Sequence, residues 1–299
     1  MIVVFPCSAD SEQLPDSKFL KESMTCEELG IEFTTVNLRA VMRGDLTRAF
    51  LHTANGDGKL TVYRGGTLRP DEYRLFHQAL RDRGLCLLTA PEQYDATQLF
   101  PCFFPHIAEF SIPAIATTSL EPAEVRMLTQ RMGPPPYFIK DFIKSAKEIW
   151  PQGCVIPSPG NVEQFATVIQ ELREFREDRF IPGLVLRPLI ELKSLGPDPF
   201  GDERFEEYRM IFLGGRRLFT LPYGHDGELS TIPAADFQRF DVIGQRINSP
   251  FFMADSVVTA TGEHFLLETG DGGCCGLPPG INLREFYQAL QGLSLSSDP

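Results

Sequence analysis

The stretch that decides the fold is residues 251–278, FFMADSVVTATGEHFLLETGDGGCCGLP. Residues 251–259 and 264–268 are rich in aromatic and β-branched side chains, which favour strands. The intervening Thr261-Gly262-Glu263 is a turn sequence. The pattern therefore predicts a β-hairpin.

The hairpin carries three acidic residues. Asp255 is expected on the first strand and Glu268 at the end of the second, and Asp271 follows in a turn dense in glycine, which lets backbone approach a ligand closely. Converging carboxylates with room for water suit a magnesium ion that is shared with substrate phosphates. The alternative is that Asp255 is a solvated strand residue, Asp271 a turn residue and Glu268 a paired carboxylate.

Composition narrows the classes of function. The chain has 299 residues, enough for two domains, and 42% of them are hydrophobic, which supports a buried core. Its net charge is −12 and no run of lysines and arginines stands out, so a nucleic-acid partner is not expected. We expect a cytoplasmic protein with no membrane partner, because there is no basic leader and no run of 18 apolar residues. The seven cysteines show no CxxC spacing, so neither disulfides nor a zinc site is predicted.

The first hundred residues alternate between strand and helix patterns. Residues 2–5 and 31–37 are predicted strands, and residues 16–29 between them are a predicted helix whose apolar side is Phe19, Leu20, Met24 and Leu29. This βαβ order implies a parallel sheet. Further strands are expected at 60–63 and 85–89, with a helix over 70–83 between them. Arg64, after the third strand, either faces an anion or lies on the surface.

The rest of the chain mixes helices and strands. Helices are predicted over 121–132, 161–180, 233–247 and 282–290, and a hairpin from 205–212 and 216–221. A strand is predicted over 183–190, interrupted by Arg187-Pro188, where the proline indicates either an edge strand or the exit from a strand. Residues 137–150, YFIKDFIKSAKEIW, concentrate Lys140, Lys144 and Lys147 behind a strand-like start. Such cations at a strand end can hold nucleotide phosphates. The alternative is a helix with the three lysines on one solvated face.

This order of parts resembles the ATP-grasp superfamily, and in particular its clade named for one arginine and two lysines. The matching segments are FIKDFIKSAKE at 138–148, LVLRPLIEL at 184–192, EEYRMIF at 206–212 and, most specifically, LLETGDGGCCGLP at 266–278. The resemblance covers essentially the whole chain. It implies α/β and α+β architecture: a pre-ATP-grasp α/β domain over 1–105, a two-lobed ATP-grasp domain over 106–292, and a frayed tail over 293–299.

The resemblance implies an ATP- and magnesium-dependent ligase that joins a carboxylate to an amine through an acyl phosphate. Its substrates would be a small molecule or peptide bearing the carboxylate, and an amine. Lys140 matches the first phosphate lysine and either Lys144 or Lys147 the second. The implied catalytic residues are Arg209 and Lys147; the implied nucleotide-binding residues are Lys140, Lys144, Arg187, Pro188, Leu189, Ile190 and Glu191; the implied metal ligands are Asp255, Glu268 and Asp271.

Alternatives to the ligase stay open. Many superfamily members carry asparagine two residues after the metal-binding glutamate, and here that position is Gly270, with Asp271 next. A protein that keeps the fold and binds a nucleotide or a partner without turnover is therefore one alternative. An ATP-dependent kinase on the same scaffold is another, because it would use the same phosphate and metal residues.

Overall fold

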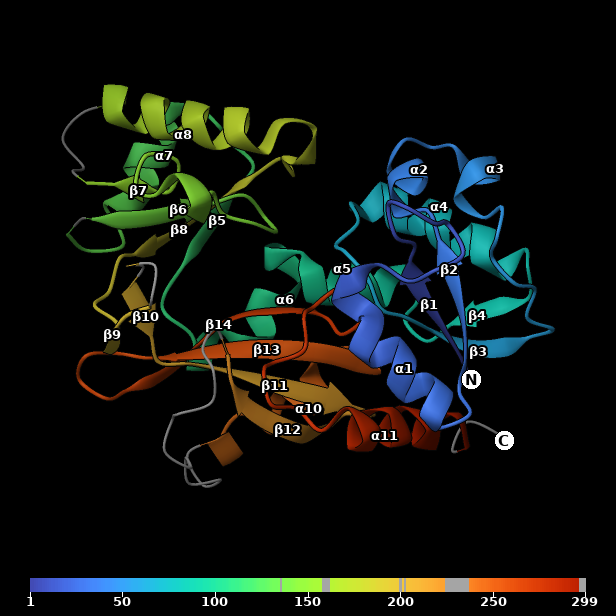
Figure 1. Ribbon diagram of the computed structural model, residues 1–299. Coiled ribbons are helices and arrows are strands. Elements are labelled where there is room, and N and C mark those ends of the chain that lie inside the picture. The colour runs from blue at the N-terminus through green and yellow to red at the C-terminus, as the bar shows by residue number, and fades with distance from the viewer. Residues whose placement is uncertain (135, 158–161, 199–200, 202, 224–236, 296–299) are drawn as a thin grey trace. The chain divides into compact units, whose positions relative to one another are not determined.

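The computed structural model describes residues 1–134, 136–157, 162–198, 201, 203–223 and 237–295. The chain divides into two compact units, each built from separate stretches. The first unit takes Met1–Thr97, Tyr208–Ala254 and Thr269–Pro299, and the second unit takes Gln98–Glu207 and Asp255–Glu268. Figure 1 shows the elements of both units. These units group residues by their contacts and not by a single cut in the sequence. The domain boundary expected between residues 105 and 106 therefore stays a prediction.

The first unit contains a parallel sheet at the start of the chain. Its strands are β1 (Ile2–Pro6), β2 (Glu32–Val36), β3 (Lys59–Tyr63) and β4 (Leu85–Leu87), in the order β2-β1-β3-β4. All three pairings are parallel, which confirms the predicted βαβ arrangement. Every residue of β1 is buried, as expected for the centre of a parallel sheet that is covered on both faces.

Helices accompany this sheet. They are η1 (Ser17–Phe19), α1 (Leu20–Glu28), α2 (Leu38–Met42), α3 (Leu46–Ala49), α4 (Pro70–Arg81), α5 (Pro91–Gln98) and, from the chain's far end, α11 (Leu283–Leu295). The helix expected over 70–83 is confirmed: it begins with a proline at N1, where no amide donor is needed. The predicted apolar side of the helix over 16–29 is confirmed only in part: Phe19 and Leu29 pack against an apolar cluster, and Leu20 and Met24 do not. Leu20 and Met24 are 52% and 53% exposed, and α1 instead buries Glu22, Ser23 and Cys26.

A second sheet holds the two predicted hairpins. Its strands are β11 (Glu207–Leu213), β12 (Arg216–Pro222), β13 (Phe251–Val258) and β14 (His264–Asp271), in the order β12-β11-β13-β14. Strand β14 continues through Gly270 to Asp271, so Asp271 ends a strand and the turn begins only after it. Before β13 lies α10 (Ile243–Arg246), where a longer helix over 233–247 was expected; residues 233–236 lie outside the described part of the chain.

The second unit is built around an antiparallel sheet. Its strands are β5 (Ile115–Thr117), β6 (Tyr137–Lys140), β7 (Val155–Ile156) and β8 (Leu184–Pro188), in the order β5-β8-β6-β7. The remaining elements are α6 (Phe100–Ile107), η2 (Ala108–Phe110), α7 (Pro122–Thr129), η3 (Lys147–Ile149), α8 (Val162–Arg176), η4 (Glu177–Arg179) and the two-stranded sheet of β9 (Ser194–Pro197) and β10 (Glu203–Phe205).

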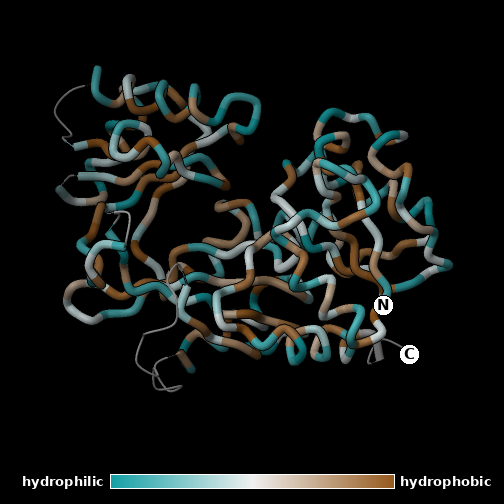
Figure 2. The backbone as a smooth tube through the Cα atoms, viewed as in Figure 1, coloured by the Kyte–Doolittle hydropathy of each residue, from teal (hydrophilic) through white to brown (hydrophobic). Residues whose placement is uncertain are grey.

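Helix α8 covers one face of that sheet. Its buried residues Phe165, Val168, Ile169 and Leu172 pack in one apolar cluster with residues of β6 and β8. Figure 2 shows hydrophobic and hydrophilic residues alternating along this helix, as expected when one side is buried. Across the described residues, no helix combines the length and apolar character that crossing a bilayer requires.

Candidate functional site

The pairing of β6 with β8 sorts their side chains onto two faces. Tyr137 and Ile139 belong to the apolar cluster under α8. Because side chains alternate along a strand, Phe138 and Lys140 lie on the opposite face. Arg187 is the direct partner of Phe138 in the antiparallel register, so it shares that face. The sheet therefore presents two cations, Lys140 and Arg187, on the side away from α8.

Lys140 is paired with Glu268 within the second unit. Its Nζ lies 2.7 Å from Glu268 Oε2, and the side chains are 5% and 37% exposed. Burial lowers the pKa of Lys140, with Arg187 and Lys144 adding to the effect, although Glu268 opposes it. Burial would raise the pKa of Glu268, but Lys140 and Lys144 outweigh it and hold that pKa well below its ordinary value. Glu268 is thus an ionised carboxylate among several cations.

Arg187 is held by two contacts. Its Nη2 donates to the Leu267 carbonyl at 2.8 Å, and its guanidinium lies 5.5 Å from the centre of the Phe100 ring. Burial lowers its pKa to about 10. Within the described residues its Nε is buried without a hydrogen-bond partner. An unpaired buried donor on a charged group costs on the order of 1–3 kcal/mol or more, which an acceptor supplied by a ligand would remove.

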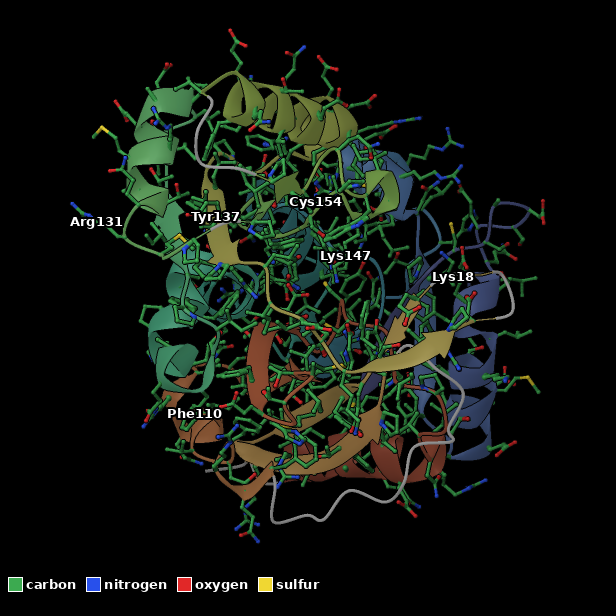
Figure 3. The ribbon with its side chains drawn as sticks, turned by 90° about the vertical axis from the view of Figure 1, so that its left-hand side faces the viewer. Lys18, Phe110, Arg131, Tyr137, Lys147 and Cys154 are labelled. Carbon is green, nitrogen blue, oxygen red and sulfur yellow. The ribbon has the colours of Figure 1, made fainter. Side chains whose placement is uncertain are left out.

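The segment after β6 carries the other two lysines. Lys144 and Lys147 are both exposed, and both contribute to lowering the pKa of Glu268. The helix alternative for residues 137–150 is wrong, because strand β6 ends at Lys140 and only the short η3 follows. Figure 3 labels Lys147 with Tyr137 and Cys154, all in the second unit. Four cations, with Lys140 and Arg187 among them, thus surround one carboxylate, which is the charge balance of an anion site.

Strand β8 lies between β5 and β6 and ends at Pro188, so the proline marks the exit from a strand and not an edge. The predicted base-binding residues begin at this proline. Pro188, Leu189 and Ile190 are half-buried, and Glu191 is exposed. The Leu189 amide already donates to the Pro136 carbonyl at 2.9 Å, and the Glu191 carbonyl accepts from Ala260. The backbone groups of this segment are therefore partly used within the protein, and their role toward a base stays a prediction.

In the first unit, the turn after β14 is held by two arginines. Arg209 Nη1 donates to the Gly276 carbonyl at 2.6 Å, and its guanidinium lies 3.5 Å from the centre of the Tyr223 ring. Arg64 Nη1 donates to the carbonyls of Gly272 and Cys275, the latter at 2.9 Å. The chain from Gly272 to Gly276 is thereby fixed by donors from outside the turn.

Arg64 belongs to a buried network. It is 1% exposed, and its Nε and Nη2 donate to the two carboxylate oxygens of Glu22 at 2.8 and 3.1 Å. The Tyr287 hydroxyl donates to Glu22 at 2.6 Å. Burial would lower the pKa of Arg64, but Glu22 outweighs it and the pKa is raised. The surface interpretation of Arg64 is wrong, and the inward turn of Glu22 explains why α1 exposes two of its apolar residues.

Asp271 is enclosed in the first unit. It is 1% exposed, and its Oδ1 accepts from the Gly273 amide at 2.9 Å. Burial raises its pKa to about 6, against the hydrogen bonds from Thr89 and Gly273. A Cβ at Gly273 would come 2.6 Å from the Tyr63 carbonyl oxygen, which explains the glycine. Asp271 thus shapes the turn that follows it.

The predicted metal ligands do not form one cluster among the residues described. Asp255 on β13 and Glu268 on β14 belong to the second unit, and Asp271 belongs to the first. No three His, Cys, Asp or Glu side chains in the described part of the chain are grouped so that they would hold a metal ion. Magnesium usually keeps several waters and binds one or two carboxylates together with substrate phosphates, so the partly exposed Glu268 beside the cations fits such an ion.

Sequence reasoning missed Asp141. This residue follows Lys140, is fully buried, and binds the backbone of the turn that leads to Lys144. A local signal existed, because aspartate commonly accepts hydrogen bonds from amides two and three residues ahead in turns. Its burial against a distant arginine carried no signal in the sequence.

Comparisons with known proteins agree on the fold. No curated protein matches this chain. Among solved structures, the D-cycloserine synthetase DcsG is 16% identical with a TM-score of 0.60, covering 98% of this chain and 99% of that one. The ATP-grasp ligase PsnB, complexed with a minimal precursor, Mg and ADP, is 12% identical with a TM-score of 0.56, covering 98% of each chain.

A third neighbour, the D-alanyl-alanine synthetase A from Vibrio cholerae, is 12% identical with a TM-score of 0.59, covering 99% of this chain and 98% of that one. At such identities the likeness shows the fold. The model of the ATP-grasp domain, family 3 of the clade named for one arginine and two lysines, matches residues 131–290, which is more than half of the chain. The match includes β6, β8 and β14 with their charged residues, and the chain belongs to this ATP-grasp family.

Proposed function

We propose that the chain is an ATP- and magnesium-dependent ligase that joins a carboxylate to an amine through an acyl phosphate. The observation that carries the proposal is the charge balance on one face of the second unit. Lys140, Arg187 and two further lysines act on the carboxylate of Glu268, and Arg187 keeps a buried Nε without a partner among the described residues. A polyphosphate would supply the missing negative charge and the missing acceptor.

Each cation has a proposed role toward ATP. Lys140 is buried at a strand end and would hold a phosphate as a fixed point charge, with either Lys144 or Lys147 as the second phosphate lysine. Arg187, steadied by Phe100, would donate its buried Nε to the same anion. Pro188, Leu189 and Ile190 would line the base, and Glu191 would reach the ribose.

Magnesium, when bound, would neutralise charge on the phosphate oxygens. Asp255, Glu268 and Asp271 are the proposed ligands. Glu268 is the best supported of the three, because its carboxylate is ionised, partly exposed and adjacent to the proposed phosphate lysine.

The proposed reaction transfers the terminal phosphoryl group of ATP to an oxygen of the substrate carboxylate. The amine nitrogen then attacks the acyl carbon, the bond to the phosphate oxygen breaks, and the amine's proton leaves to solvent. Arg209 and Lys147 are the proposed catalytic cations for charge that develops in these steps, and such stabilisation is worth on the order of 100-fold or more in rate. Solved neighbours support this class of reaction: PsnB is an ATP-grasp ligase with a precursor, and DcsG is a synthetase.

Calorimetry with ATP, in the presence and absence of magnesium, tests the site. We expect magnesium-dependent binding by the wild type and its loss in Glu268→Ala. Glu263→Ala is the matched control, because Glu263 is an exposed glutamate on the same hairpin. The chain's single tryptophan, Trp150, is 50% exposed and stacks on Phe138, whose face of the sheet also bears Lys140, so its fluorescence gives a second readout. Absence of ATP binding in every condition would refute the proposal.

Product analysis tests the reaction. Incubation with candidate acids and amines should release ADP and inorganic phosphate only when both substrates are present. A stable phosphoester formed without any amine would instead establish a kinase. Nucleotide binding without turnover across a broad substrate panel would favour the non-catalytic alternative.

A further inference from the structure

We propose that Asp141 is the positioning residue that holds Lys144, rather than Lys147, beside Lys140 as the second phosphate-binding lysine. The inference rests on the proposed function, because it concerns how the same site grips the polyphosphate. It assigns a role to a residue whose own negative charge would not attract the polyphosphate.

Asp141 organises the turn between the two lysines through one carboxylate oxygen. Its Oδ1 accepts from the amides of Ile143 and Lys144, both at 2.6 Å. The turn is closed by a further bond, in which the Asp141 amide donates to the Lys144 carbonyl at 3.0 Å. The backbone of Lys144 is therefore bonded to Asp141 through both its amide and its carbonyl.

The second carboxylate oxygen ties this turn to the end of α8. Asp141 Oδ2 accepts from Arg176 Nε at 3.1 Å and from the Ile181 amide at 3.4 Å. Arg176 in turn donates to the Arg179 carbonyl at 3.2 Å. Asp141 is 0% exposed, so this is a buried ion pair, whose loss of one partner is strongly destabilising.

Phe142, the next residue, stabilises the same turn through two further contacts. Its carbonyl accepts from the Phe100 amide, at the start of α6, at 2.9 Å. Its ring lies against Gly183, where an added Cβ would come 2.2 Å from a ring carbon. Phe100 also lies under Arg187, so the turn and the arginine share one support.

Among the described residues, Lys147 has no comparable link to this support. It begins the separate turn η3, six residues beyond Asp141, and Ala146 before it makes no side-chain cap. Since a fixed backbone reduces the freedom that a long lysine side chain loses on binding, Lys144 is the better placed partner for Lys140.

The experiment measures dissociation constants for ATP and for AMP, with magnesium held constant. The ratio of the AMP constant to the ATP constant reports the grip on the phosphate chain. A merely structural loss would weaken both nucleotides alike and leave this ratio unchanged. We expect Asp141→Asn, which keeps the shape but not the charge, to lower the ratio about tenfold, the effect of a lost charge-assisted contact.

A double-mutant cycle then identifies the residue through which Asp141 acts. In a Lys144→Met background, Asp141→Asn should change the ratio no further. In a Lys147→Met background it should still lower the ratio about tenfold. If Asp141→Asn does not fold, Arg176→Gln replaces it in the cycle, because it breaks the same ion pair and leaves both turn amides bonded.

Three results would overturn the inference. One is an unchanged ratio in Asp141→Asn, and another is a full effect that persists in Lys144→Met. The third is an effect that disappears in Lys147→Met, which would make Lys147 the positioned lysine. Wild-type protein that binds neither nucleotide, or both equally, would instead refute the proposed function itself, and this inference with it.

Discussion

Removing the positive charge of Arg64 should destabilise the protein more than any surface ion-pair substitution. In Arg64→Met, the Glu22 carboxylate stays only 7% exposed and keeps the Tyr287 hydroxyl as its remaining donor from this network. The carbonyls of Gly272 and Cys275 also lose the donor that joins them to β3. The change therefore leaves a buried charge uncompensated and loosens the turn after β14.

The magnitude follows from burial. Breaking a buried ion pair by removing one partner costs about 3–5 kcal/mol. Each carbonyl left unsatisfied would add about 1–3 kcal/mol if no water reached it. A domain is stable by only about 5–15 kcal/mol, so the ion pair alone accounts for a large part of the free energy of unfolding. The double variant with Glu22→Gln should recover part of the loss, because it removes the stranded charge.

Urea unfolding at neutral pH measures these differences. The control is Lys59→Met, which removes the surface pair between Lys59 and Glu32, 43% and 63% exposed, and should cost at most about 1 kcal/mol. A cost for Arg64→Met no greater than that of the control would refute the reasoning. So would a double variant less stable than Arg64→Met, because the stranded Glu22 charge would then not be the main cost.

Three further predictions concern single residues. Burial raises the pKa of Asp271 from 3.8 to about 6, so the folded protein binds this proton more tightly than the unfolded chain; the stabilisation, about 3 kcal/mol, is complete below pH 3.8 and is lost as pH rises through 6. Urea unfolding from pH 4 to 7 should show this fall in wild type and not in Asp271→Asn, and parallel profiles would contradict it. Phe100→Leu removes the aromatic ring under Arg187, a cation–π contact worth about 0.5–1 kcal/mol, and should therefore weaken ATP binding several-fold. Phe100→Tyr is the control, because it keeps an aromatic ring at this position. Equal affinities of Phe100→Leu and wild type for ATP in calorimetry would show that the contact does not contribute to binding. Gly183→Ala should lower the unfolding free energy by more than about 1 kcal/mol, because φ is +129° and the new Cβ would meet the Phe142 ring, and a melting temperature equal to wild type would contradict this.

Local patterns in the sequence were sufficient for much of the fold. The parallel sheet and both hairpins follow from runs of β-branched and aromatic residues separated by turns, and the structure confirms them. The inward side of α1 could not be read this way, because Glu22 is buried by an arginine 42 residues further on. A charged residue can take a core position only when its partner is in place, and helical periodicity carries no record of that partner.

Some residues of the candidate site could likewise be predicted from the sequence, and others could not. Lys140 and Glu268, 128 residues apart, were brought together by the family resemblance and not by spacing, and the structure pairs them. The burial of Asp271 and the role of Asp141 escaped because both depend on which elements pack around them. Arg176, for example, is 35 residues from Asp141 and reads in sequence as one more charge on a solvated helix face.

The discontinuous make-up of the first unit has a consequence for synthesis of the chain. Val3 and Phe5 of β1 share an apolar cluster with Phe286 and Tyr287 of α11, which are synthesised much later. A ribosome adds about 5–20 residues per second, so β1 would wait on the order of 15 to 60 seconds for that helix. During this interval, apolar surface on an all-buried strand lacks its final cover and is open to chaperones and to aggregation. Strand β1 is thus synthesised long before α11, which supplies part of its apolar cover.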